Sequence, residues 1–401
     1  MKVVIVGAGH AGGSAAAMLR QLDFDGDITL IGEEPLPPYQ RPPLSKAWLK
    51  GEADSESLQL RPDSFYAEHG IELRLGTRVR RIEPATRCLE LGNGGTVDYD
   101  ALILATGSTA RKLPIPGADD PAVLELRTAA DADRLKAALA SGGRLIVVGA
   151  GYVGLEVAAS ARALGCEVVV IEREARVLAR VASEPLSAFF ERFHREQGVT
   201  VVTGATVVGI DPGGRGVRLA DGTTIEGDAV LVGVGASACD QLASSAGLRC
   251  DGGIVVDERA RTSDPNVWAI GDCTNRPCPL YGETARLESV PNALEQAKQA
   301  AAAITGAPPP APEVPWFWSD QYELKLQIAG LPFGVDRLVL RGDPASDCFA
   351  VFHLKGEVIQ AVEAVNAPAE FMGGKQLIAR RAAVDPDKLA DPSVGMKTVA
   401  V

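Results

Sequence analysis

Two glycine-rich turns of the same pattern follow short apolar runs in this chain. Residues 3–6 lead into Gly7-Ala8-Gly9-His10-Ala11-Gly12, and residues 145–148 lead into Gly149-Ala150-Gly151-Tyr152-Val153-Gly154. In such a turn the first glycine permits a sharp bend, the second lets backbone approach a pyrophosphate, and the third lets the next helix pack on the strand. The unpaired N–H groups at the start of that helix then bind the phosphates. The sequence therefore predicts two dinucleotide sites, which we call the first cradle and the second cradle.

An acidic residue follows each cradle at the end of the next apolar run. The run 28–31 ends at Gly32-Glu33, and the run 168–171 ends at Glu172. A carboxylate about 20 or more positions after such a turn accepts hydrogen bonds from the ribose of an adenine dinucleotide. Glu172 favours NAD because it would repel the 2′-phosphate of NADP, whereas Arg173 beside it could accept one. The alternative interpretation is a doubly wound sheet whose glycine turns bind no nucleotide.

Composition narrows the class of protein. The 401 residues, 46 % of them hydrophobic, suffice for two or three domains with large cores. The net charge of −12 argues against a nucleic-acid partner. No apolar run approaches the roughly 18 residues of a membrane span, and the first strand follows Met1 and Lys2 too closely for a signal peptide. We therefore expect a soluble, cytoplasmic protein.

The cysteines and histidines indicate neither disulfides nor a metal site. Cysteine occupies seven positions without an even framework, so reduced thiols are expected: Cys88, Cys166, Cys239, Cys250, Cys273, Cys278 and Cys348. The four histidines, His10, His69, His194 and His353, lack the spacing of metal ligands.

Apolar periodicity predicts an α/β fold with two Rossmann-like dinucleotide-binding domains and a small C-terminal α+β domain. The first domain is discontinuous, at 1–110 and 236–310; the second is 111–235 and the third 311–401. Strands are expected at 72–75, 79–82, 88–91, 101–107, 199–202, 217–219 and 229–232, in a returning pair at 254–256 and 267–272, and at 325–328, 337–340, 350–354 and 358–365. Helices are expected at 14–22, 155–164 and 291–304, with a single helix at 370–381 ending the last domain. The proline-rich stretch 35–45 predicts an ordered loop, and 307–312 a stiff spacer.

Longer motifs carry a resemblance to a known family. Besides the cradles they are Tyr39-Gln40-Arg41-Pro42-Pro43-Leu44-Ser45-Lys46, Ala105-Thr106-Gly107, Ile270-Gly271-Asp272, Glu288-Ser289-Val290-Pro291-Asn292-Ala293-Leu294-Glu295-Gln296-Ala297 and Pro315-Trp316-Phe317-Trp318-Ser319-Asp320-Gln321-Tyr322. Over essentially its whole length the chain resembles the FAD-dependent, NADH-linked ferredoxin reductases of bacterial oxygenase systems. These are the putidaredoxin reductase-like members of the glutathione-reductase-type flavoproteins with two dinucleotide sites. The last two motifs are the most specific.

The resemblance implies that FAD, tightly bound, occupies the first cradle and that NADH, the substrate, enters the second. It places the FAD diphosphate on Gly7, Gly9, Ala11 and Gly12 and the adenosine ribose on Glu33. Around the same cofactor it places Arg41, Lys46, Val79, Ala105, Thr106, Gly107, Arg127, Gly271, Asp272, Val290 and Trp318. For NADH it implies Gly149, Gly151, Tyr152, Gly154, Glu156, Glu172 and Gly235. Asp272 could instead be a helix cap.

Four residues are expected at the reacting atoms. The resemblance pairs Lys46 with Glu156 near the reactive edge of the flavin, where a cation would stabilise the negative charge that a hydride brings. It also implies that Tyr152 covers the flavin until nicotinamide displaces it, and that Trp318 lies by the isoalloxazine. The plainer alternatives are a solvated lysine and aromatic side chains that only pack, since Trp316 and Trp318 share one face of a strand.

One absence points to the electron acceptor. Related flavoproteins that reduce disulfides or peroxides carry a redox cysteine after the ribose-binding acid, and residues 33–50 contain none. A working disulfide between Cys273 and Cys278 is not expected, because cysteine after Gly-Asp is ordinary in this family. Electrons would therefore leave singly, to an acceptor such as an iron–sulfur protein. The resemblance implies an acidic [2Fe–2S] ferredoxin that docks near basic residues and serves a haem monooxygenase. Docking candidates are Lys298, Lys375, Arg380 and Arg381, which could also be ordinary solvated charges.

Rival functions are the reductase component of a ring-hydroxylating dioxygenase, an NADH oxidase, peroxidase or disulfide reductase, and a redox-sensing flavoprotein.

Overall fold

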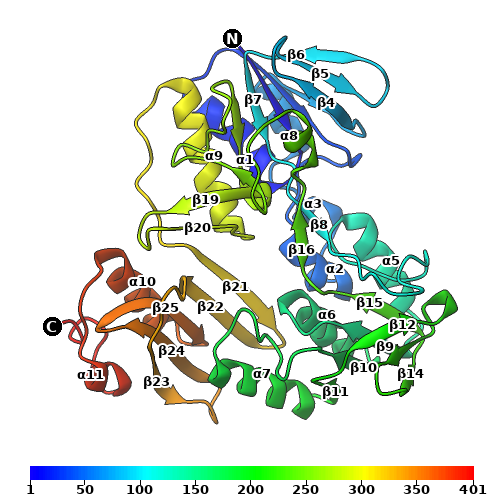
Figure 1. The fold of residues 1–401 in the computed structure, drawn as a ribbon, viewed down its shortest axis with the longest axis vertical. Coiled ribbons are helices and arrows are strands. Elements are labelled where there is room, and N and C mark those ends of the chain that lie inside the picture. Colours follow the sequence, from blue (N-terminus) through cyan, green and yellow to red (C-terminus); the bar gives the residue numbers. More distant parts are fainter. The chain divides into compact units, whose positions relative to one another are not determined.

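The computed structural model describes residues 1–401 and divides the chain into two compact units (Figure 1). The first unit consists of Met1–Gln40, Ser55–Thr109 and Ser237–Pro315, and the second of Arg41–Asp54, Ala110–Ala236 and Trp316–Val401. The chain changes unit within two short strands that pair with each other, β8 (Ser108–Ala110) and β16 (Ala236–Ala238).

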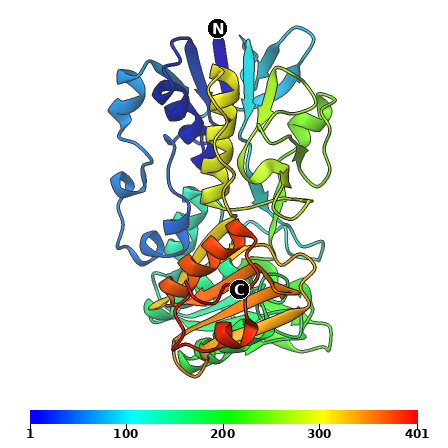
Figure 2. The same cartoon turned by 90° about the vertical axis from the view of Figure 1, so that its left-hand side faces the viewer.

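The core of the first unit is a five-stranded parallel sheet in the order β18-β7-β1-β2-β3. Its strands are β1 (Lys2–Val6), β2 (Asp27–Ile31), β3 (Ile71–Arg74), β7 (Ala101–Leu104) and β18 (Val267–Ala269). Continuous apolar runs suit strands that are covered on both faces. Helix α1 (His10–Gln21) follows β1 and lies beside α9 (Val290–Thr305), as Figure 2 shows.

Smaller elements complete the first unit. One antiparallel sheet contains β4 (Val79–Glu83), β5 (Cys88–Leu91) and β6 (Thr96–Asp98), and another group contains β17 (Ile254–Val255), β19 (Thr274–Cys278) and β20 (Glu283–Ala285). The helical turns are α3 (Ser55–Leu58), α4 (Asp63–Glu68), α8 (Gln241–Ser245) and η3 (Gly271–Cys273). The predicted pairing of 254–256 with 267–272 is wrong. Strand β18 pairs with β7 and β17 pairs with β19, because the second of these runs completes the central sheet.

The second unit repeats this design on a four-stranded parallel sheet, β11-β10-β9-β15. Its strands are β9 (Arg144–Val148), β10 (Glu167–Ile171), β11 (Val199–Val202) and β15 (Ala229–Val232). Helices α5 (Ala129–Leu139), α6 (Tyr152–Ala163) and α7 (Glu184–Glu196) belong to it, as do strands β12 (Val207–Ile210), β13 (Gly216–Leu219) and β14 (Thr224–Glu226) and the turn η2 (Pro212–Gly214). The proline-rich segment contributes η1 (Pro42–Ser45) and α2 (Ala47–Lys50).

The C-terminal part of the second unit is a five-stranded antiparallel sheet in the order β21-β22-β25-β24-β23. Its strands are β21 (Trp316–Gln321), β22 (Leu324–Gly330), β23 (Arg337–Asp343), β24 (Cys348–Lys355) and β25 (Val358–Val365). Helix α10 (Pro368–Arg380) packs on β25. The expectation of one helix after the strands is corrected by a further short helix, α11 (Pro386–Ala390).

Candidate cofactor and nucleotide sites

Three neighbouring strand ends surround the first cradle. It follows β1 directly, and the turns after β7 and β18 lie on the same side of β1, because these strands are parallel neighbours. The strand ends are joined by hydrogen bonds from Ala105 N to the Val6 carbonyl at 2.7 Å and from Ile270 N to the Leu104 carbonyl at 2.9 Å. The crevice outside the carboxyl ends of parallel strands is where ligands bind in α/β sheets.

Two glycines of the first cradle, Gly7 and Gly12, cannot be exchanged for larger residues without movement of the backbone. A Cβ on Gly7 would lie 2.1 Å from the Ala105 carbonyl oxygen, and Gly7 has φ +114°. A Cβ on Gly12 would lie 1.9 Å from the Gly7 carbonyl oxygen. These two close approaches are those that a strand–turn–helix phosphate cradle requires. Gly9 precedes the first residue of α1, and Ala11 is buried in its first turn.

The turns after β7 and β18 bring polar groups to the first cradle. The hydroxyl of Thr106 donates to the Cys239 carbonyl at 2.6 Å, and Gly107 accepts from Cys239 N at 2.9 Å. Ser108 donates to Asp272 Oδ2 at 3.2 Å. Gly271, with φ +80°, lets this turn approach α1 so closely that its Cβ would lie 3.0 Å from that of Ala11.

Three further predicted FAD residues also belong to the first unit. Glu33 follows β2 and is largely exposed, with Arg78 Nη1 3.6 Å from its Oε1. Val79 is buried at the start of β4, and Val290 is the first residue of α9, after the capping residue Ser289. The structure therefore assigns to one unit the predicted residues Gly7, Gly9, Ala11, Gly12, Glu33, Val79, Ala105, Thr106, Gly107, Gly271, Asp272 and Val290.

His10 is a candidate that the sequence pattern did not single out. It is the first residue of α1, inside the cradle, and its Nδ1 is buried without a hydrogen-bond partner. Burial lowers its pKa, against the opposing charge of Asp272, so the imidazole is neutral at pH 7. The signal in the sequence is its position between Gly9 and Ala11 of the cradle. The spacing of the four histidines, which was considered only for metal binding, does not mark it.

The second cradle has the same backbone construction. A Cβ on Gly149, which has φ +106°, would lie 2.5 Å from the Gly233 carbonyl oxygen, and a Cβ on Gly154 would lie 2.2 Å from the Gly149 carbonyl oxygen. No atom lies within 4 Å of the position that a Cβ on Gly151 would take, so this side of the turn is open. Gly235, with φ +108°, lies in the turn after the neighbouring strand β15. This cradle also fits a dinucleotide phosphate.

The carboxylate of Glu172 is part of the turn itself. One oxygen, Oε2, accepts from Ala150 N at 2.7 Å and the other, Oε1, from Glu174 N at 2.9 Å. Arg173 next to it is mostly exposed and donates to Glu174 Oε1 at 2.8 Å. Glu172 thus lies at the cradle, as a ribose-binding acid must, while the neighbouring Glu174 holds the guanidinium that could attract a 2′-phosphate.

Tyr152 is the first residue of α6 and reaches toward the C-terminal sheet of its unit. Its hydroxyl donates to the Val181 carbonyl at 3.1 Å, and its ring meets that of Phe317 edge to face at 4.8 Å between centroids. Burial raises the pKa of the phenol well above its usual 10, with Glu363 adding to the shift. The hydroxyl therefore stays protonated, and the residue acts as an aromatic surface and not as a base.

Lys46 and Glu156 form the ion pair that the resemblance predicted. Lys46 Nζ lies 2.7 Å from Glu156 Oε2, and the two side chains are 19 % and 7 % exposed. Glu156 also accepts from Ser45 Oγ on the same oxygen and from Ser319 Oγ on the other, each at 2.6 Å. A carboxylate with this many donors is held in one orientation. Sequence reasoning missed both serines, although each adjoins a predicted site residue.

Four predicted FAD residues, Arg41, Lys46, Arg127 and Trp318, belong to the second unit. Arg41 Nη1 donates to the Arg127 carbonyl at 2.5 Å. Trp318 stacks obliquely on Trp316 at 5.6 Å between centroids. The predicted FAD residues are therefore divided between the two units. Lys46 and Trp318 belong to the same unit as Tyr152 and Glu156.

The two cysteines of the Cys-x₄-Cys pair beside Asp272 are free, buried thiols, Cys273 and Cys278. Burial raises the pKa of Cys273 to about 11 and also raises that of Cys278, which disfavours nucleophilic chemistry at either sulfur. No cluster of three or more His, Cys, Asp or Glu side chains is arranged to hold a metal ion.

Comparison with known proteins now adds a family to this geometry. Residues 1–297 match the family model described as pyridine nucleotide-disulphide oxidoreductase, and residues 316–400 match the one described as reductase C-terminal. The chain belongs to the pyridine nucleotide-disulphide oxidoreductase family. Members of this family typically bind FAD and use NAD(P)H.

One relative, the probable ferredoxin reductase CtmF of Castellaniella defragrans, is 52 % identical to this chain. The match covers 100 % of this chain and 99 % of the relative. The ferredoxin–NAD(+) reductase component of the anthranilate 1,2-dioxygenase system of Burkholderia cepacia is 42 % identical over 98 % of each chain. The structure of the covalent complex of putidaredoxin reductase with putidaredoxin matches with a TM-score of 0.96 at 43 % identity, covering 99 % of this chain and 97 % of that one.

These comparisons confirm the assignment made on motifs. The chain is a flavoprotein oxidoreductase of the ferredoxin reductase type, with two Rossmann-like parallel sheets and a C-terminal antiparallel domain. None of its helices is both long and apolar enough to cross a membrane. The cytoplasmic location and the division into three domains stay predictions.

The first cradle fits FAD on its own geometry. Gly7 and Gly12 let the turn pack tightly on its neighbours, the first N–H groups of α1 have no partner within the helix, and His10 Nδ1 has no partner in the protein. Phosphates and sugar hydroxyls supply the acceptors and donors that these groups lack.

Proposed function

We propose that the chain is an NADH-dependent reductase that holds FAD tightly in the first cradle, admits NADH at the second, and delivers single electrons to a [2Fe–2S] ferredoxin. The repetition of the cradle carries this proposal. Gly7 and Gly149 end the central strands of two parallel sheets, each with φ above +100° and a neighbouring carbonyl where a Cβ would lie. Two such turns bind two dinucleotides.

When bound, FAD supplies the acceptance of a hydride and the release of electrons one at a time. The residues of this chain supply orientation and charge. Lys46, fixed by Glu156, offers a half-buried cation that stabilises added negative charge. Tyr152 and Trp318 offer aromatic faces, and Glu172 offers a carboxylate that binds a ribose hydroxyl and repels a 2′-phosphate. No proton has to be moved by a side chain, and no acid–base triad is proposed.

The proposed acceptor is an acidic [2Fe–2S] ferredoxin. A structure 43 % identical to this chain is a complex of a reductase with its putidaredoxin, which supports a small redox protein as partner. In the second unit, α10 and its end carry Lys375, Arg380 and Arg381, and Lys375 Nζ lies 5.1 Å above the Trp316 ring. In the first unit, Lys298 is already paired with Glu313 at 3.2 Å. The α10 residues are therefore the stronger docking candidates.

For the terminal enzyme we propose a haem monooxygenase, because the motif 288–296 resembles reductases of that system. The relative that belongs to a dioxygenase system favours the alternative, a ring-hydroxylating dioxygenase. An NADH oxidase or redox-sensing flavoprotein is the other candidate; the absence of cysteine from 33–50 counts against a peroxidase or disulfide reductase.

Stopped-flow absorbance tests the proposal. NADH should bleach the flavin within seconds, and an added [2Fe–2S] ferredoxin should restore its colour faster than oxygen does. Bleaching over minutes with no acceleration by any ferredoxin encoded near the gene would exclude a ferredoxin reductase. Reoxidation by oxygen alone at the rate of turnover would support the oxidase instead.

A further inference from the structure

A buried carboxamide on α9 holds the turn that carries Asp272. Gln296 is fully buried, and its Oε1 accepts from Gly271 N at 2.8 Å and from Thr274 Oγ1 at 2.9 Å. Both donors belong to the turn η3 and the residue after it, so one side-chain oxygen fastens that turn to the helix. Gln296 is not among the residues predicted from the sequence to bind a cofactor.

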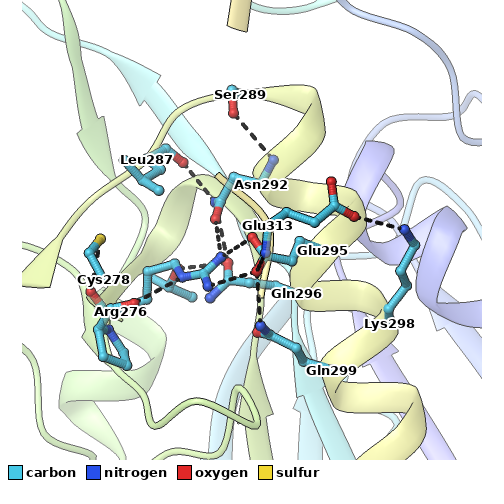
Figure 3. A network of polar contacts seen from close by, with 12 residues as sticks. Arg276, Cys278, Leu287, Ser289, Asn292, Glu295, Gln296, Lys298, Gln299 and Glu313 are labelled. Atoms are coloured by element: carbon cyan, nitrogen blue, oxygen red, sulfur yellow. Dashed lines mark hydrogen bonds and ion pairs between the residues drawn. The ribbon is translucent and has the colours of Figure 1, made fainter. Parts of the chain in front are cut away.

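A network of buried polar side chains fixes the orientation of Gln296 (Figure 3). Asn292 Nδ2 also donates to Gln296 Oε1, at 3.3 Å, while Asn292 Oδ1 accepts from Arg276 Nη1 at 2.9 Å. Arg276 in turn forms a two-point ion pair with Glu295, at 2.8 and 3.2 Å. A backbone N–H can only donate, so the atom that faces Gly271 N must be the amide oxygen.

This arrangement leaves the other end of the carboxamide unsatisfied. Gln296 Nε2 is buried and has no hydrogen-bond partner. A buried donor without a partner costs on the order of 1–3 kcal/mol. Folding stability alone therefore gives a weak reason for glutamine here, and the value of the side chain lies in the acceptor that it presents to Gly271 and Thr274.

The turn held in this way is adjacent to the first cradle. The Cβ position of Gly271 lies 3.0 Å from Ala11 Cβ on α1, and Asp272, the next residue, accepts from Ser108 Oγ. Gly271 has φ +80°, a conformation that glycine adopts freely and can also leave freely. Thr274 donates to the Gly271 carbonyl within the turn, and Gln296 is the acceptor outside the turn that holds Gly271 N.

We propose that Gln296 is a positioning residue for FAD: it holds Gly271 and Thr274 so that the Asp272 carboxylate is in place for the ribityl hydroxyls. The inference rests on the proposed function, which puts FAD in the first cradle. Gln296 itself acts through the turn, and loss of its amide should loosen the FAD site before it affects the NADH site.

The test compares two buried glutamines of the same helix. Gln296→Met keeps the length of the side chain and removes the amide, and Gln299→Met is the matched control. Gln299 is also buried and donates to Glu295 Oε1 at 3.3 Å, away from Gly271. The measurement is the dissociation constant of FAD for each apoprotein, from quenching of flavin fluorescence. We expect at least a tenfold increase for Gln296→Met and less than a twofold change for Gln299→Met.

Two further readouts separate positioning from a general loss of structure. The thermal midpoints of the two apoproteins should fall by similar amounts, and the dissociation constant for NAD⁺ should stay within twofold in both. Thr274→Val, which removes the hydroxyl shared between Gln296 Oε1 at 2.9 Å and the Gly271 carbonyl at 2.8 Å, should weaken FAD binding by a smaller factor. Its effect should not add to that of Gln296→Met, because the two residues share one hydrogen bond.

Three results would overturn the inference. They are unchanged FAD affinity in Gln296→Met, an equal loss of affinity in Gln299→Met, and, if Gln296→Met does not fold, unchanged affinity in Thr274→Val. Wild-type apoprotein that binds no FAD would instead overturn the proposed function. Tight binding by wild type and by every variant would overturn only the role of Gln296.

Discussion

The two cradles share a backbone but differ in what lies next to them. In both, a glycine with strongly positive φ faces a carbonyl of the adjacent strand end, Ala105 for Gly7 and Gly233 for Gly149. The first cradle is bordered by a turn that a buried network holds, around Gln296. At the second, no atom lies within 4 Å of the Cβ position of Gly151, and the ring of Tyr152 beside it meets that of Phe317 edge to face.

Under the proposed function, the glycine pattern provides a phosphate site and the residues beside it select the ligand. A site with a fixed floor suits a cofactor that stays bound, because no rearrangement is needed after it enters. A site with one open side suits a substrate that must enter and leave in each turnover. Five experiments test the contrast between the cradles.

The largest effect on ligand binding is expected from adding one methyl group at the first glycine of each cradle, where it meets a carbonyl of the adjacent strand end. Gly7→Ala should raise the dissociation constant for FAD by at least about 100-fold. The strain of a positive φ, about 1–3 kcal/mol, adds to the clash with the Ala105 carbonyl. Gly149→Ala should weaken NAD⁺ binding similarly and leave FAD in place. FAD content after purification and NAD⁺ titration calorimetry measure both.

Gly165→Ala is the matched control for this pair. Gly165 has φ +85° with no atom within 4 Å of its Cβ position, so it adds strain without a clash. Both ligands should bind to that variant as to wild type. If Gly7→Ala or Gly149→Ala weakened the binding of FAD and of NAD⁺ by the same factor, the two cradles would not be independent binding sites.

Acid should affect the unit of the second cradle through His194. This histidine is fully buried, and burial lowers its pKa to about 4, so the native unit keeps it neutral while the unfolded chain takes up a proton below pH 6.5. Stability should therefore fall as pH falls from 6.5 to about 4, by about 3 kcal/mol. Urea unfolding followed by tryptophan fluorescence measures it, since Trp48, Trp316 and Trp318 lie in this unit.

His194→Gln should remove most of this pH dependence while lowering stability at pH 7. A slope that persists unchanged in the variant would assign the acid sensitivity to other groups, His10 of the first cradle among them.

The Lys46–Glu156 pair should control how fast NADH reduces the flavin. Glu156→Gln leaves Lys46 without its counter-charge, and we expect the reduction rate to fall about 30-fold, or about 2 kcal/mol, as for the loss of a fixed charge beside a reacting centre. Stopped-flow absorbance at saturating NADH measures it. Glu52→Gln is the control, because Glu52 pairs with Lys50 at 2.6 Å but is mostly exposed. Equal rates in Glu156→Gln and wild type would remove the pair from the reaction.

Glu172 should give a preference for NADH over NADPH of about tenfold or more in kcat/KM, because like charges in a partly buried site repel by about 1–2 kcal/mol. Glu172→Gln should narrow that preference, while Glu174→Gln should narrow it less. Initial rates with both coenzymes measure the ratio. Equal use of both by wild type would take the ribose-binding role from Glu172.

The smallest effect is expected at the docking residues. Lys375→Glu should lower kcat/KM for the ferredoxin about threefold to tenfold at low salt and leave ferricyanide reduction unchanged, because rim charges mainly steer association. Lys388→Glu on α11 is the control, being exposed and 3.9 Å from Asp385. Loss of both activities in Lys375→Glu would indicate damage to the flavin site instead of a weakened partner.

The parts predicted best were those with local causes. The strands at 88–91, 199–202, 229–232 and 358–365 have the expected bounds, because uninterrupted apolar runs between turn residues leave few alternatives. The pairing of β18 with β7 was missed because partners far apart in sequence leave no local trace. Helix α11 was missed because five residues carry little periodicity.

The candidate site divides in the same way. The Lys46–Glu156 contact was expected from family resemblance, since 110 positions separate the residues and no spacing could reveal it. Its second and third donors, Ser45 and Ser319, came only from the structure. The segment Arg41–Asp54 was assigned to the first domain by its place in the chain, and it packs within the second unit.

The two cradles, their parallel strands and the acidic residue after each could be read from the sequence, because glycine spacing and apolar runs act through neighbours along the chain. The tertiary structure decided what borders each cradle: the network around Gln296 at the first, and Tyr152, Phe317 and the ion pair of Lys46 at the second. Those contacts join residues from distant parts of the chain, and burial, which turns a polar contact into a strong constraint, exists only after the chain has folded.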